Sequence, residues 1–165
     1  MFPQAAKNTQ EVESILETAK LVMKAAKYCF LITLDESGHP TARLMDPFDP
    51  EAGMKVWMGT NKNTRKVEQV KNDIRATLAY YDAEGMGYVT LIGKVRLVMD
   101  PMLKEKWWKE EWNAFYPDGN KSEVFCLIEF SPFRIEVMDI SRKVLVNLFR
   151  PEIITLKNSF WVHEK

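Results

Sequence analysis

The feature that most constrains the fold is a series of short runs rich in aromatic and branched apolar residues, separated by turns. Turn residues such as Asp35-Glu36-Ser37-Gly38 join successive runs, as in β-hairpins. Helical stretches do not alternate regularly with these runs, as they would in a parallel sheet. The pattern therefore predicts an α+β protein built on a small antiparallel barrel. The six or seven expected strands are residues 28–34, 39–48, 55–59, 74–82, 88–100, 124–131 and 133–140, the last two broken at Ser131-Pro132.

Three stretches have the spacing of amphipathic helices. The first starts at Asn8-Thr9-Gln10-Glu11, which resembles a capping box, and continues to Ala26. The second follows Asn63, and the third is expected over 101–116, where Pro101 suits a first turn. Gly93, inside a long predicted strand, indicates a bulge or bend. In the third helix Trp108, Trp112 and Phe115 follow i, i+4, i+7; we interpret them as a packing face, the alternative being a stacking platform for a base or flavin.

Composition excludes some classes of protein. The 165 residues fit one domain with a real core, and 23 basic residues balance 23 acidic ones, which argues against a general nucleic-acid binder. No apolar run reaches the length of a membrane span and the start lacks a secretion signal, so a cytoplasmic location is expected. Cys29 and Cys126 each lie in an apolar run, which predicts two buried, reduced thiols.

Few residues offer catalytic chemistry of their own. The only histidines are His39, interpreted as a plain turn residue, and His163, near the C-terminus, so the sequence does not favour a metal site. No nucleophile elbow, dinucleotide fingerprint or P-loop occurs in the sequence. If the protein is an enzyme, a bound cofactor would supply the reactivity.

The segment GTNKNTRKVEQV, residues 59–70, places cations at a predicted helix start. Asn63 or Thr64 can cap the helix, while Lys62, Arg65 and Lys66 add charge to a dipole end that is already positive. That arrangement becomes favourable if an anion binds there, phosphate being the expected guest. The alternative, that these long side chains are only solvated, stays open on the residues alone.

Arg43 is a second charged residue in an unusual place, because it lies in a predicted strand beside the apolar Leu44 and Met45. If it faces inward it requires a charged partner; if it faces outward it is a solvated strand residue.

Several motifs in order resemble the pyridoxamine-phosphate-oxidase-like FMN-binding split-barrel family, and within it the general stress protein branch. They are Arg43-Leu44-Met45, the strand Val56-Trp57-Met58-Gly59-Thr60, the turn Thr64-Arg65-Lys66, and Tyr88 to Val95 around Gly93. The loop after AFYPDG and the two strands that follow it are also similar. The resemblance covers roughly residues 10–140.

The resemblance implies a six-stranded antiparallel split β-barrel with flanking helices, forming a homodimer with FMN in the groove between subunits. It implies a single domain over 1–140, and leaves 141–165 as an extension of unknown role. The family's phosphate contacts fall on Arg65 and Lys66 with Thr64 beside them. Its flavin and ribityl contacts fall on Arg43, Leu44, Met45, Gly59, Thr60 and Asn61.

Two departures narrow the function implied. The chain has FSPFRIEVMD where the vitamin-forming oxidases carry a pyridoxal-phosphate signature with a histidine, so that activity is not expected. Met138 stands where the stress-protein branch often has an aromatic residue.

The resulting hypothesis is an FMN-dependent oxidoreductase, with NAD(P)H as a possible electron donor. The alternatives are a non-catalytic flavin-binding stress protein, or a deazaflavin or haem in the same groove.

Overall fold

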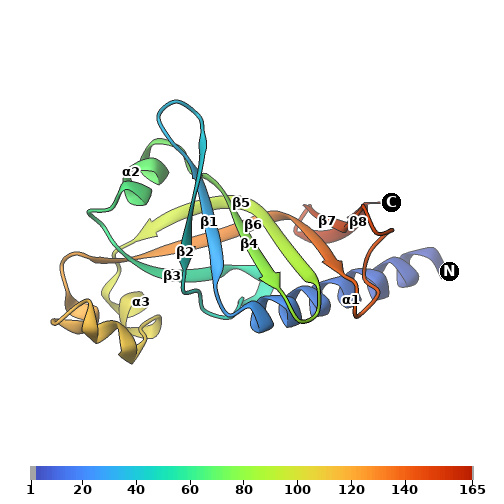
Figure 1. Cartoon of the computed structure of the whole chain (residues 1–165), viewed down its shortest axis with the longest axis horizontal. Helices are drawn as coiled ribbons and strands as arrows, with labels where there is room; N and C mark the ends of the chain where they lie inside the picture. Colours follow the sequence, from blue (N-terminus) through green and yellow to red (C-terminus); the bar gives the residue numbers. More distant parts are fainter. Residues whose placement is uncertain (1–2, 165) are drawn as a thin grey trace.

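The fold is seen in a computed structural model that describes residues 3–164, and it is a strongly bent antiparallel sheet with one long helix against it (Figure 1). The helices are α1 (Pro3–Ala26), α2 (Arg65–Asn72) and α3 (Pro101–Lys106), with 3-10 turns at Ala52–Met54, Glu110–Ala114 and Gly119–Lys121. The strands are β1 (Cys29–Leu34), β2 (Pro40–Met45), β3 (Val56–Asn61), β4 (Arg75–Asp82), β5 (Gly87–Val98), β6 (Phe125–Asp139), β7 (Glu152–Lys157) and β8 (Phe160–Glu164).

All strand pairs are antiparallel, as predicted, in the order β2-β1-β4-β5-β6-β7-β8, with β3 paired to β6. The first half of β6 pairs with β3 and its second half with β7. Among the described strands, β2 pairs only with β1 and β3 only with β6, apart from an isolated bridge between Pro47 and Met58. The barrel is therefore open between β2 and β3.

The expectation of six strands is wrong in number, since the sheet has eight. Residues after 140, where the sequence predicted no strand, supply β7 and β8. The predicted break at Ser131-Pro132 is also wrong, because β6 runs continuously to Asp139. Pro132 lies opposite Gly93, where the β5–β6 register shifts. Because a bulge tolerates a proline that a regular ladder would not, the predicted bulge at Gly93 is confirmed and accounts for the apparent break.

Helix α1 begins at Pro3, before the capping box predicted at 8–11, and packs against β4 and β5. Its apolar stripe follows the predicted spacing and enters the core with the inward residues of the strands. Cys29 and Cys126 are buried and unbridged, as expected, and burial raises the pKa of Cys29 to about 12. Desolvation likewise raises the pKa of Cys126.

The predicted helix over 101–116 is wrong beyond its first turns: α3 ends at Lys106 and a 3-10 turn follows. Trp107 stacks on Trp57, whereas Trp108 contacts Phe125 edge-on. Adjacent residues point in different directions on a helix, so a continuous helix would not bury both indoles against the sheet. Phe115, the third member of the predicted face, is largely exposed.

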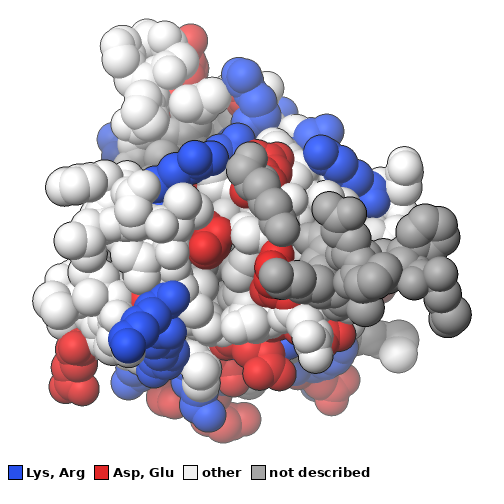
Figure 2. All heavy atoms as spheres, turned by 90° about the vertical axis from the view of Figure 1, so that its right-hand side faces the viewer, with Lys and Arg blue, Asp and Glu red and all other residues white. Residues whose placement is uncertain are grey.

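The charges are dispersed over the end of the molecule that carries the two termini. On that face Lys and Arg lie among Asp and Glu, as the balanced composition suggested (Figure 2). None of the helices in the described part of the chain has the length and apolarity that a membrane crossing requires.

Candidate functional site

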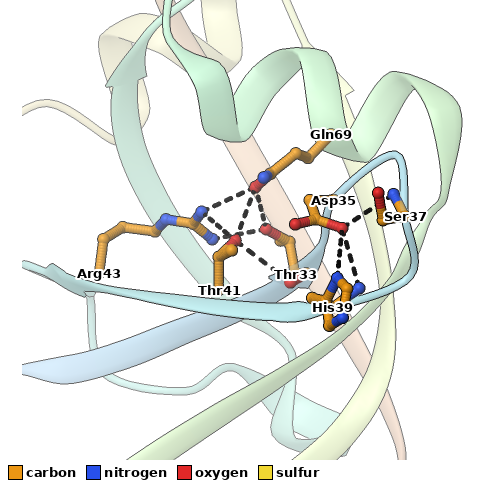
Figure 3. A network of polar contacts seen from close by, with 7 residues as sticks. All are labelled: Thr33, Asp35, Ser37, His39, Thr41, Arg43 and Gln69. Carbon is orange, nitrogen blue, oxygen red and sulfur yellow. Dashed lines mark hydrogen bonds and ion pairs between the residues drawn. The ribbon is translucent and has the colours of Figure 1, made fainter.

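Arg43 lies at the centre of a polar cluster that joins β1, β2 and α2 (Figure 3). Its Nη1 donates to Thr33 Oγ1 at 2.5 Å and to the Leu31 carbonyl at 3.3 Å. Its Nη2 donates to Thr41 Oγ1 at 2.8 Å and to Gln69 Oε1 at 2.7 Å. The Thr33 and Thr41 hydroxyls also donate to Gln69 Oε1, at 2.6 and 3.1 Å. The guanidinium is thus held by several acceptors in one orientation.

All of these acceptors are neutral oxygens, so no described side chain is the charged partner expected for an inward-facing Arg43. No carboxylate forms an ion pair with Arg43 within the part of the chain whose side chains are described. Burial, and then the charge of Arg65, lower the pKa of Arg43. The folded chain therefore holds a half-buried positive charge without neutralising it.

The start of α2 has unpaired donors, as the sequence suggested. Thr64 is the N-cap, but its hydroxyl makes no cap bond and donates instead to the Asn61 carbonyl at 2.9 Å. Asn61 Oδ1 accepts from the Asn63 N–H at 2.8 Å, which fixes the turn before the helix. The backbone N–H groups of Arg65 and Lys66 have no hydrogen-bond partner among the described residues. Two donors at the positive end of α2 are therefore available to an acceptor.

Lys66 turns back from this helix start toward β3, where its Nζ donates to Thr60 Oγ1 at 3.0 Å. Burial and then the charge of Arg43 lower the pKa of Lys66. Like Arg43, it has no ion pair among the described side chains. Arg65 is exposed and lines a cleft together with Asp35, Glu68 and Gln69. Its charge still acts on Arg43.

The remaining predicted site residues lie on the two strand edges that face the opening of the barrel. Arg43, Leu44 and Met45 are on β2, whose second edge no other strand covers, and Gly59, Thr60 and Asn61 are on β3, which pairs only with β6. Unpaired strand edges present N–H and C=O groups. The side chains differ: Leu44 is 60% exposed, whereas Met45 is buried in the core.

Three members of the Arg43 cluster, Thr33, Thr41 and Gln69, were not predicted. The hairpin register places Thr33 opposite Thr41, so two hydroxyls on one face beside Arg43 follow from the predicted turn. Gln69 carried no such signal, because its partners lie on other elements. His39 is an exposed turn residue, as predicted, and its N–H donates to Asp35 Oδ1 at 2.9 Å.

Solved structures with the same fold are known. A protein from Clostridium acetobutylicum, related to general stress protein 26 of Bacillus subtilis, superposes with a TM-score of 0.75 at 20% identity, over 90% of this chain and 99% of that one. A pyridoxamine 5'-phosphate oxidase-related, FMN binding protein from Nostoc punctiforme gives 0.64 at 16% identity, over 99% and 97%. A haem binding protein from Mycobacterium smegmatis gives 0.63 at 16%, over 84% of this chain and 57% of that one.

These likenesses identify the fold as the split barrel. A search of curated protein sequences finds no match. The family model described as pyridoxamine 5'-phosphate oxidase like matches residues 11–156, which is most of the chain. The chain belongs to the pyridoxamine 5'-phosphate oxidase-like family.

Proposed function

We propose that the protein binds FMN, with the cofactor phosphate at the start of α2, and acts as an FMN-dependent oxidoreductase. The observation that carries this proposal is the unneutralised positive charge around two unpaired N–H groups. The charge of Arg65 acts on Arg43, and that of Arg43 acts on Lys66. Arg65 also acts on the Asp35 carboxyl, but none of the three cations forms an ion pair among the described side chains. An anion at this place would remove their repulsion and accept from the free donors.

The residues fit a phosphate group in chemistry as well as in charge. Lys66 and the N–H groups of Arg65 and Lys66 would donate to phosphate oxygens, with Arg65 and the Thr64 hydroxyl beside them. The backbone edges at Arg43–Met45 and Gly59–Asn61 would contact the ribityl chain and the flavin ring. When bound, the isoalloxazine would supply the redox chemistry, and the chain would bind and orient it.

A homodimer with the cofactor at the interface accords with the exposed apolar face of β2, β1 and β4. Phe30 on β1 is 50% exposed and stands between Leu44 of β2 and Ala79 of β4. Exposed neighbours of this kind often mark a protein–protein contact. A second copy would cover this row and close the open side of the barrel.

The absorption spectrum of the purified protein, followed by titration with FMN, tests the proposal. Lys66→Ala should weaken FMN binding by about 1.5–3 kcal/mol, as for loss of a charged hydrogen bond. Lys62→Ala, which removes a neighbouring amine with no side-chain contact to this cluster, is the matched control and should bind FMN normally. Colourless protein that takes up no FMN would overturn the proposal.

The spectrum also separates the alternatives. The Mycobacterium smegmatis relative binds haem, so a Soret band in the protein as isolated would favour haem, whereas a deazaflavin has its own absorption. Steady NAD(P)H consumption by the FMN-loaded protein would exclude a non-catalytic storage or sensing role.

A further inference from the structure

Gln69 is the residue on which the donors of the Arg43 cluster converge (Figure 3). Its side chain reaches from α2 to the β1–β2 hairpin, and the residue is only 6% exposed. Its Oε1 accepts from Arg43 Nη2 at 2.7 Å and from the Thr33 and Thr41 hydroxyls at 2.6 and 3.1 Å. An amide oxygen has two lone pairs, so three donors crowd it. Neither Gln69 nor the two threonines are among the residues proposed to contact FMN.

For folding alone, a carboxylate would suit the position of Gln69 better than an amide. A carboxylate has about four lone-pair sites and accepts the fork of an arginine through two parallel hydrogen bonds. It would also neutralise Arg43, which is half-buried and forms no ion pair among the described side chains. A partly buried charge without a counter-ion destabilises the folded state. Glutamine collects the same donors but leaves the positive charge of Arg43 in place.

The retained charge lies in a fixed position beside the start of α2. Acceptors from β1, β2 and α2 surround the Arg43 guanidinium, so it cannot swing toward solvent without losing several hydrogen bonds at once. The charge of Arg43 acts on Lys66, whose ammonium is proposed to meet the cofactor phosphate. A cation that is already oriented and desolvated binds an anion at a lower entropic cost than a mobile one.

We propose that Gln69 is a positioning residue for the FMN site. Together with Thr33 and Thr41 it holds Arg43 in one orientation, and because it is neutral it leaves the charge of Arg43 to act on the bound anion. Gln69 itself touches no part of the cofactor and acts through Arg43. The inference rests on the proposed FMN function, and it implies that an acidic residue at this position would stabilise the fold and weaken cofactor binding.

The variant Gln69→Glu tests the role of charge. Thermal unfolding without added cofactor should show a melting temperature above that of the wild type, because Arg43 gains a counter-ion. Fluorescence titration at pH 7 should show FMN affinity lower by about tenfold or more, since the variant cancels one nearby positive charge. Asn72→Asp is the matched control, because it adds the same charge at an exposed position of α2 outside the cluster. It should bind FMN with nearly wild-type affinity.

The pH profile of FMN binding separates this role from a purely structural one. In the wild type the charge of Arg43 helps to lower the pKa of Lys66. Gln69→Glu would cancel that charge, so the loss of FMN affinity at alkaline pH should move to higher pH than in the wild type. A variant that only loosened the fold would bind FMN more weakly without moving the profile.

The pair Thr41→Val and Thr41→Ser tests the orientation without adding any charge. Thr41→Val removes the hydroxyl that accepts from Arg43 Nη2, and valine suits a strand, so the variant should fold and should bind FMN several-fold more weakly. Thr41→Ser keeps the hydroxyl and should bind FMN nearly as the wild type does. This comparison decides the orientation even if Gln69→Glu does not fold.

The outcomes separate this inference from the proposed function. A wild type that takes up no FMN would overturn the proposed function, and the positioning role with it. A wild type that binds FMN leaves that function standing, and three results would then each overturn the role of Gln69 alone. They are wild-type FMN affinity in Gln69→Glu, a melting temperature of Gln69→Glu below that of the wild type, and equal FMN affinity of Thr41→Val and Thr41→Ser.

Discussion

At the scale of single residues, Lys66 carries a charge that the folded protein disfavours. Its folded pKa lies below the ordinary 10.5 because of burial and then Arg43. The cost of the ammonium is therefore present in full below the folded pKa, shrinks as pH rises through that pKa, and is gone above the ordinary 10.5. A phosphate bound as proposed would favour the ammonium, so FMN binding at alkaline pH would take up a proton.

From this sign we predict that FMN affinity falls as pH rises through the lowered pKa of Lys66, before 10.5 is reached. Flavin fluorescence titrations from neutral to alkaline pH measure it. Lys66→Arg keeps its charge over this range and should flatten the profile. A wild-type profile already flat over the same range would contradict the assignment of Lys66.

Some residues of the candidate site could be predicted from the sequence, and others could not. Cations at a helix start and an arginine in an apolar strand break local rules, so both are visible in the sequence. The structure places the cations at the start of α2 and Arg43 on β2, as predicted. Gln69 was not visible, since a glutamine on a helix breaks no rule. Its role depends on the docking of α2 onto the β1–β2 hairpin, which only the tertiary structure specifies.

At the scale of elements, Gly59 shows how a strand accommodates the segment after α3. A Cβ added at Gly59 would lie 2.4 Å from Trp112 Cζ3 and 2.8 Å from Phe125 Cε2. Trp112 is buried there and its indole N–H donates to Asp46 Oδ2 at 3.2 Å. The glycine proposed as a cofactor contact therefore also has a packing reason, which the strand pattern alone did not reveal.

We predict that Gly59→Ala destabilises the protein by about 1–3 kcal/mol through overpacking, measured by urea denaturation. The double variant Gly59→Ala/Trp112→Leu should lose less stability than the sum of the two single variants, because leucine leaves room for the added methyl group. Additive losses would show that the two residues do not compete for this space.

The C-terminal extension is a second case at this scale. We propose that residues 141–164 fold cooperatively with the barrel, because β7 pairs with β6 and Ile154 is fully buried in the main core. Ile154→Ala should cost about 2–5 kcal/mol in denaturant unfolding. Leu156→Ala, at a partly exposed position of the same strand, should cost much less. Equal small losses would mean that the tail unfolds independently.

At the scale of the whole molecule, antiparallel order and the α+β class followed from the sequence because turn residues and strand periodicity are local. The number of strands did not follow from the sequence, because β7 and β8 are short and partly exposed. Local periodicity does not encode the pairing of β7 with β6 or of β8 with β7. The opening between β2 and β3 likewise depends on how the barrel closes, which the local sequence does not show. Both strand edges proposed to contact the flavin border this opening.

The open barrel and the apolar row around Phe30 lead to a prediction about assembly. If two copies meet on the β2-β1-β4 face, Phe30→Lys places a charge in a dry contact and should convert the dimer to a monomer, measured by light scattering during size-exclusion chromatography. FMN affinity should fall with it, since the second subunit would line the groove. Met102→Lys changes an exposed residue of α3 and should leave the mass unchanged. A wild-type monomer at micromolar concentration, or a Phe30→Lys dimer, would place the proposed interface elsewhere or remove it.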